Sequence, residues 1–270
     1  MPSFPLIAVD VGNSRTKLGY FPSAPLDSEL PTPSAMVELS GVAWTTESLR
    51  AWLESLGPAS AAAGWLVGSV NRAAAERLES AVAEIFPAAR TMRLTPRDLP
   101  LVVGVPAPDG VGIDRLLGAV AANRVRGAGR AAIVLHVGTA ITANLISADG
   151  AFVGGAILPG IALSAQALHD YTDLLPRIDM IDLAESPPAV GAATEPAIRS
   201  GLFWGAVGAM RELVARMTAA ANSEADVLLT GGAAPSVAHL LGEAVRCEPH
   251  LVLAGIALAA EHRGKWQAEP

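Results

Sequence analysis

One short pattern occurs twice in this chain, and the two copies lie about half the chain length apart. Each copy is an apolar segment, a small polar turn built on glycine, and a second segment of strand-forming residues. The copies are residues 7–16 and 133–142, and their second strands are expected at 17–21 and 143–147. Solenoid repeats have periods of roughly 20–50 residues, so this spacing predicts a duplication and two related domains.

The first copy combines three groups that suit phosphate chemistry. Asp10 ends the first strand, Gly12 begins the turn and Lys17 follows it. A kinase needs a carboxylate for Mg²⁺, backbone amides for phosphate and a cation for the charge on the transferring group. The alternative is an ordinary hairpin in which Asp10 only bonds its own turn, and the second copy favours the functional interpretation.

The second copy keeps the turn but not the carboxylate. Its turn, which contains Gly138 and Thr139, is followed by Thr142, while His136 stands where the first copy has Asp10. A single histidine at a strand end is more often a core or turn residue than a chemical group. The pattern therefore indicates a second anion-binding turn whose carboxylate has been lost.

A third candidate element is the run Gly112-Ile113-Asp114-Arg115, which leads into an expected helix ending at Val125. Asp114 is placed to accept a proton from a substrate hydroxyl, and Arg115 to give local positive charge. Helix capping by Asp114 beside a surface arginine is the alternative. Four residues alone do not decide between these interpretations.

Composition narrows the class of protein. Hydrophobic residues make up 51% of the 270 residues, which is ample for two cores. The net charge of −7 argues against binding to a nucleic-acid backbone, and a single cysteine, Cys247, excludes an intramolecular disulfide. No signal peptide is visible, and the apolar stretch 131–146 is too short to span a bilayer. We expect a cytoplasmic protein without a membrane or nucleic-acid partner.

The pattern along the chain is α/β throughout, with a hairpin at the start of each half. We expect domains at 1–126 and 127–270, with the glycine-containing residues 126–130 as the linker. Helices are expected at 46–56, 72–86, 113–125 and 197–220, strands at 65–70 and 226–230, and a helix toward Leu175 opened by residues 154–160. Thr194 is expected to be the N-cap of the long helix.

Taken in order, these motifs resemble the type III pantothenate kinases, a family of the actin-like superfamily. The segments that carry the resemblance are 10–17, 112–115, 138–142, 154–160, 174–176, 194–201 and 230–232. The Gly-x-Asp-Arg element, in sequence with the others, is the specific part. The resemblance implies two duplicated ribonuclease H-like (actin-like) domains with a nucleotide cleft between them.

The resemblance also implies a reaction and a set of residues. The reaction is ATP-dependent phosphorylation of pantothenate, the first step toward coenzyme A, with Asp114 as the proton acceptor. The segment from Asp10 to Lys17 and Thr139 would bind ATP, and Asp10 would also hold Mg²⁺. The ATP-binding residues are Asp10, Val11, Gly12, Asn13, Ser14, Arg15, Thr16, Lys17 and Thr139. The pantothenate pocket would contain Val105, Gly112, Ile113, Asp114, Arg115 and Thr194. Family members are homodimers.

Two positions depart from the family pattern. Members usually carry aspartate at the position of His136, where it ligates a monovalent cation, and tyrosine at that of Val105, where it contacts pantothenate. We expect no monovalent cation at His136 and an altered substrate contact at Val105. Two alternatives remain open, namely a non-catalytic or regulatory nucleotide-binding relative, and a kinase for another small hydroxylated acid.

Overall fold

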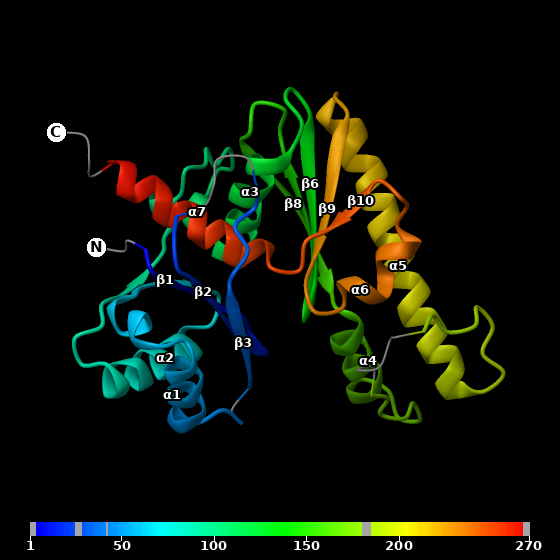
Figure 1. Ribbon diagram of the computed structural model, residues 1–270. Coiled ribbons are helices and arrows are strands. Elements are labelled where there is room, and N and C mark those ends of the chain that lie inside the picture. Colours follow the sequence, from blue (N-terminus) through cyan, green and yellow to red (C-terminus); the bar gives the residue numbers. More distant parts are fainter. Residues whose placement is uncertain (1–3, 25–28, 42, 180–184, 267–270) are drawn as a thin grey trace. The chain divides into compact units, whose positions relative to one another are not determined.

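The chain divides into two compact units, each built on its own five-stranded sheet (Figure 1). The computed structural model describes residues 4–24, 29–41, 43–179 and 185–266. The first unit consists of two segments, the residues up to Val125 and those from His250 onward. The second unit consists of the residues between them, from Arg126 to Pro249. The two sheets confirm the predicted α/β fold of two related domains.

The first sheet has the order β3-β2-β1-β4-β5. Its strands are β1 (Leu6–Val11), β2 (Arg15–Phe21), β3 (Ala35–Ser40), β4 (Gly64–Ser69) and β5 (Thr91–Arg93). The helices of this unit are α1 (Thr46–Ser55), α2 (Arg72–Ile85), α3 (Ile113–Val125) and α7 (Leu251–Trp266). β1 pairs with β2 antiparallel and with β4 parallel, which confirms the predicted hairpin at the start of the chain.

The two faces of the first sheet are covered by different helices. Ile7 and Val9 point toward α1 and α2 and share a core with Leu49, Leu53 and Leu78. Helices α3 and α7 pack against each other, and both pack on β4. Since alternate residues of a strand face opposite ways, Asp10 lies on the face that α3 and α7 cover.

The second sheet has the order β10-β9-β6-β7-β8. Its strands are β6 (Ala131–Val137), β7 (Ala140–Ile146), β8 (Phe152–Pro159), β9 (Ala225–Thr230) and β10 (Val245–Cys247). The helices of this unit are α4 (Ile161–Asp170), α5 (Thr194–Ala221) and α6 (Ala234–Val237). β6 pairs with β7 antiparallel and with β9 parallel, so the second unit repeats the pairing pattern of the first. Ile133 and Leu135 share a core with Phe203 and Val207 of α5.

The C-terminal helix differs from the expected division of the chain. Residues 127–270 were expected to form one domain, but α7 packs on β1, β2 and α3 and groups with the first unit. Helix α7 can approach α3 closely because it has glycine at position 255, where a Cβ atom would lie 2.1 Å from the Leu117 carbonyl oxygen. The first ten residues of α7 are buried and lack polar side chains, so the sequence gives no sign of which sheet this helix covers.

Two other expectations were wrong in detail. Residues 154–159 do not open a helix but form most of β8, and only Gly160 belongs to the helix start, as the N-cap of α4. Glycine lets the strand lie close to its neighbour: a Cβ on Gly155 would lie 2.0 Å from the Ala143 carbonyl oxygen. The helix that follows begins only at Ile161. Thr194 is the first residue of α5, and Ala193 is the N-cap.

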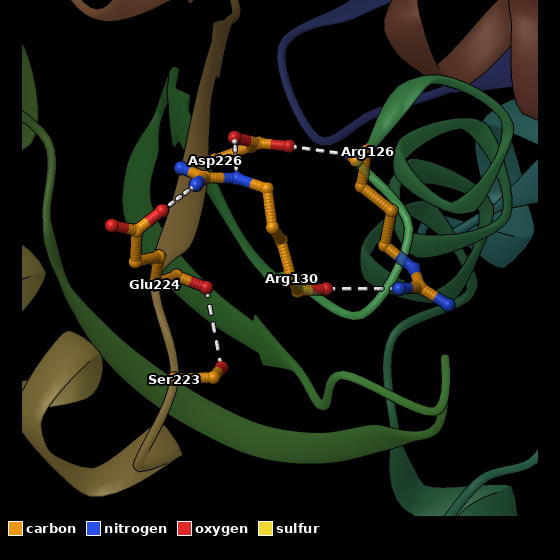
Figure 2. Close-up of polar contacts among 6 residues, drawn as sticks. Arg126, Arg130, Ser223, Glu224 and Asp226 are labelled. Atoms are coloured by element: carbon orange, nitrogen blue, oxygen red, sulfur yellow. Dashed lines mark hydrogen bonds and ion pairs between the residues drawn. The ribbon is translucent and has the colours of Figure 1, made fainter.

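The expected linker at residues 126–130 is a turn that polar contacts attach to the second unit (Figure 2). Asp226, in β9, accepts a hydrogen bond from the Gly127 N–H at 2.7 Å and from Arg130 Nε at 2.7 Å. Arg130 also pairs with Glu224, and Arg126 donates to the Arg130 carbonyl oxygen at 2.8 Å. The chain therefore enters the second unit through an ordered segment.

Candidate functional site

The first part of the site is the end of β1 and the turn that follows it. Asp10 is the direct partner of Lys17 across β1 and β2 and of Gly68 across β1 and β4. Direct partners point to the same face of a sheet, so the Asp10 and Lys17 side chains share the face of α3 and α7. Gly68 adds no side chain there, and a Cβ would lie 2.6 Å from Leu117.

The Asp10 carboxyl group has an unusual environment. Burial raises its pKa, the negative charge of Asp114 raises it further, and Lys17 opposes both effects, so that the pKa rises from 3.8 to about 7. No residue in the described part of the chain contributes a hydrogen bond that would lower this pKa. A cation that binds to this carboxylate would stabilise its charged form.

Asp114 comes to the site from the start of α3. It is the second residue of the helix and partly buried, and its Oδ1 accepts a hydrogen bond from the Arg115 N–H at 2.9 Å. A Cβ on Gly112 would lie 2.7 Å from this same Oδ1, so glycine leaves room for the carboxylate.

Arg115 follows Asp114 and is also partly buried. Burial lowers the pKa of its guanidinium group, and the neighbouring Asp114 opposes this effect. Ile113 is buried, and Val105 is partly buried in the loop before α3. All the predicted substrate residues from Val105 to Arg115 therefore belong to the first unit, as Asp10 does.

The turn between β1 and β2 is exposed where the sequence predicted phosphate binding. The Gly12 N–H donates to the Arg15 carbonyl oxygen at 2.9 Å, while Asn13 and Ser14 are exposed. Arg15 is engaged elsewhere, since its Nη1 lies 2.8 Å from Glu38 on the next strand. Val11 and Thr16 are buried strand residues, and their backbone rather than their side chains bounds the turn.

The second unit contains the corresponding turn, with one residue fewer. Four residues separate the partners Val11 and Thr16, but only three separate Val137 and Ile141. Thr139 is exposed on this turn, and its carbonyl oxygen accepts from the Gly160 N–H at 2.9 Å. The hydrogen bond from Gly160 thus fixes the backbone of the turn, while Thr139 is exposed to solvent.

His136 occupies the strand position that corresponds to Asp10. It pairs with Thr142 on one side and Thr230 on the other. Its ring packs against a glycine turn: a Cβ on Gly231 would lie 2.7 Å from the imidazole Cδ2. A partly buried imidazole packed in this way offers no carboxylate oxygen, so these residues do not fit a monovalent cation.

The structure brings together only part of the predicted site. Asp10, Lys17 and Asp114 are linked electrostatically within the first unit. Thr139 and Thr194, both exposed, belong to the second unit.

One neighbour of Lys17 was not predicted. The positive charge of Lys17 acts on His250, which directly precedes α7. The only signal for His250 in the sequence was its place before a long apolar run.

Comparison with known proteins decides the family. Residues 6–216 match the sequence model of a family described as type III pantothenate kinase. The chain belongs to this family. A type III pantothenate kinase of Rubrobacter xylanophilus is 35% identical, with 93% of this chain and 95% of the relative covered. A type III pantothenate kinase of Acidiphilium cryptum is 36% identical, with 73% and 72% covered.

Solved structures show the fold of this pantothenate kinase family member. The activator of 2-hydroxyisocaproyl-CoA dehydratase from Clostridium difficile with bound ADPNP is similar over 98% of this chain and 97% of its own, with a TM-score of 0.54 and 13% identity. Acetate kinase from Porphyromonas gingivalis covers 96% and 99%, with a TM-score of 0.51 and 11% identity. These similarities confirm an actin-like α/β fold.

No helix in the described residues combines the length and apolarity needed to cross a bilayer.

Proposed function

We propose that this chain transfers the γ-phosphoryl group of ATP to the primary hydroxyl of pantothenate, which gives 4'-phosphopantothenate, the first step of coenzyme A biosynthesis. The observation that carries the proposal is the match to the type III pantothenate kinase family over residues 6–216. The reaction forms a bond from the pantothenate oxygen to the γ-phosphorus and breaks the bond from that phosphorus to ADP.

Asp114 is the proton acceptor in this proposal. Its carboxylate lies at the start of α3, near Asp10 and within reach of solvent. It takes the proton that the pantothenate hydroxyl loses as the new bond forms. Positioning the nucleophile and accepting its proton are the main tasks left to a side chain in phosphoryl transfer.

The first turn and Lys17 bind the phosphates of ATP in this proposal. Backbone N–H groups of an exposed turn bind anions, and residues 12–14 form such a turn between two strands. Lys17, on the face of Asp10, supplies positive charge to the transferring group. Thr139 makes the corresponding contact from the second unit, and Thr194 contributes to the pantothenate pocket with Val105, Gly112, Ile113 and Arg115.

The Asp10 carboxylate is suited to a magnesium ion that arrives with ATP. No cluster of three or more histidine, cysteine, aspartate or glutamate residues forms a metal site in the described residues. Mg²⁺ needs none, because it is commonly held by one or two carboxylates together with substrate phosphates. When bound, Mg²⁺ neutralises charge on the β- and γ-phosphates. The raised pKa of Asp10 supports this role, since a cation relieves the cost of its charge.

The proposal includes a homodimer in the cytoplasm. Exposed apolar side chains in the second unit support the dimer: Leu163 of α4 is 46% exposed, Ile157 of β8 63% and Leu174 88%. Apolar surfaces of this kind are typically covered by a partner, and closed two-fold dimers are the commonest arrangement. A chain with a single cysteine suits a reducing compartment.

ATP consumption with and without pantothenate tests the proposed function. We expect ADP release that depends on both pantothenate and Mg²⁺, and a product whose mass exceeds that of pantothenate by one phosphoryl group. A panel of other small hydroxylated acids serves as the control for substrate. ADP release that is indifferent to pantothenate, or no turnover by a folded protein that binds ATP, would contradict the proposal.

A further inference from the structure

His250 lies where α7 begins, at the point where the chain re-enters the first unit. Its carbonyl oxygen accepts a hydrogen bond from the Ala254 N–H at 2.9 Å. This contact makes His250 the residue that caps the helix N-terminus. The backbone of His250 is thus fixed by the first turn of α7.

The first turn of α7 lies over the strand that carries Lys17. Lys17 and Gly19 are two residues apart on β2 and therefore face the same way. A Cβ on Gly19 would lie 3.1 Å from Leu253 Cδ1. Helix α7 therefore covers the face of β2 from which the Lys17 side chain projects, and His250 precedes Leu253 by about one helical turn.

The imidazole of His250 has a buried nitrogen without a partner. Within the part of the chain that the structure describes, nothing forms a hydrogen bond with Nδ1. Burial lowers the pKa of His250, and the positive charge of Lys17 lowers it further. The ring is therefore neutral at physiological pH, and a neutral imidazole has one nitrogen that accepts a hydrogen bond.

We propose that His250 is a positioning residue for Lys17, in which Nδ1 accepts a hydrogen bond from the Lys17 ammonium group while that group binds a phosphate of ATP. The ammonium group has three donors, so one bond to Nδ1 leaves two for phosphate oxygens. The imidazole proton then lies on Nε2. The proposal deepens the proposed function and rests on it, because Lys17 acts there on the transferring group.

Three substitutions of His250 distinguish the effect of the hydrogen-bond acceptor from the effect of the side-chain volume. His250→Asn keeps an acceptor close to the place of Nδ1, His250→Gln moves the polar group outward to the place of Nε2, and His250→Leu keeps volume without an acceptor. We expect His250→Leu and His250→Gln to lower kcat/KM for ATP about tenfold, through one lost hydrogen bond to a charged group. The KM for pantothenate stays unchanged, and His250→Asn restores most of the loss.

The decisive measurement is the coupling between His250 and Lys17. In a Lys17→Met background, His250→Leu should cause no further loss of kcat/KM for ATP, whereas independent effects would multiply. Multiplying effects, unchanged ATP kinetics in His250→Leu, or equal losses in the asparagine and glutamine variants would overturn the proposal. If His250→Leu does not fold, the glutamine and asparagine variants carry the same test.

The affinity for a non-hydrolysable ATP analogue separates this proposal from the proposed function. If the unmodified protein does not phosphorylate pantothenate, the proposed function fails. The role of His250 is then judged by analogue binding, which should weaken in His250→Leu and recover in His250→Asn. Unchanged analogue binding in both variants would overturn the role of His250 in that case.

Discussion

Asp114 acts on Asp10 inside the first unit: burial raises the pKa of the Asp10 carboxyl, the charge of Asp114 raises it further, and the pKa reaches about 7 despite the opposing effect of Lys17. The two carboxylates come from segments far apart in the sequence, β1 and the start of α3. Charged together, they are unfavourable until a cation joins them. Repulsion between the two charges therefore destabilises the folded protein, and a magnesium–nucleotide complex bound beside them would relieve it.

Replacing Asp10 by asparagine should stabilise the protein in the absence of nucleotide and metal. Because the pKa is about 7 in the folded chain and 3.8 without the fold, the folded state binds more protons between these values. Stability of the unmodified protein falls as pH rises from about 4 to about 7 through this group, and the loss is complete above pH 7. We expect Asp10→Asn to gain on the order of 3 kcal/mol at pH 8.

Urea unfolding with EDTA at several pH values measures this difference. The gain of Asp10→Asn should shrink steadily as pH falls toward 4. Asp109→Asn is a matched control, because the Asp109 side chain is 75% exposed and lies in a short turn. A pH-independent difference, or a less stable Asp10→Asn at pH 8, would contradict the raised pKa.

Asp114→Asn should abolish turnover and leave the fold intact. Loss of a general base typically lowers the rate about 10²–10⁴-fold, and the amide keeps nearly the same shape. Steady-state ADP release, a thermal melt and ATP-analogue affinity are the measurements. Near-normal turnover in the folded variant would remove Asp114 from the chemistry.

Leu163→Glu should convert the expected dimer into monomers. Leu163 is 46% exposed on α4, so a carboxylate there costs little in an isolated chain but is unfavourable in an apolar interface. Light scattering at micromolar concentration distinguishes the two states. Val102→Glu, at a residue that is 71% exposed in the first unit, is the control. An unmodified protein that is strictly monomeric would refute the interface.

Activity should depend on Mg²⁺ but not on the choice between potassium and sodium at constant ionic strength. The reason is His136, whose imidazole packs against Gly231 and lacks the carboxylate oxygen that holds a monovalent cation. His136→Asp should move the enzyme toward activation by potassium. A strong potassium requirement in the unmodified protein would mean that other oxygen atoms form the site.

Asp226→Asn should destabilise the second unit. Burial alone would raise the pKa of Asp226, but hydrogen bonds from the Gly127 N–H and Arg130 and the charge of Arg130 hold it below its usual value. The stabilisation is present above about pH 4 and is lost as pH falls further. We expect a loss of about 1 kcal/mol at pH 7 for this partly exposed pair.

Thermal unfolding at pH 7 and below pH 4 measures the effect of Asp226→Asn. Glu212→Gln, which removes an exposed pair with Arg216, should change stability by less than half as much. Equal losses in both variants, or a difference that grows in acid, would argue against the role assigned to Asp226.

The sequence predicted the elements with strong local signals. Asn71 is an N-cap as expected, and its side chain accepts from the Ala74 N–H at 3.1 Å. The hairpins were predicted because their apolar and polar residues alternate around a glycine turn. Residues 154–159 were misjudged because their glycines, apolar residues and proline show no clear periodicity, and pairing with β7 decided their structure.

The site was predicted in its residues but not in its pairings. Asp10 and Asp114 were each identified from their own motif, but their mutual effect depends on α3 packing on β4, the strand that pairs with β1. His250 lay outside every motif, since its importance arises only from the return of α7 to the first unit. Long-range packing of this kind leaves no local pattern.

The difference of one residue between the two turns means that the halves of this duplication are no longer interchangeable. By plain sequence alignment Lys17 corresponds to Ala143, whose side chain lies in the core of the second unit. By strand pairing it corresponds to Thr142, on the opposite face with His136. Replacing the second turn residue for residue with the first would therefore place a lysine side chain in the apolar core of the second unit. A phosphate-binding lysine could be built into the second unit only if its turn were also lengthened by one residue.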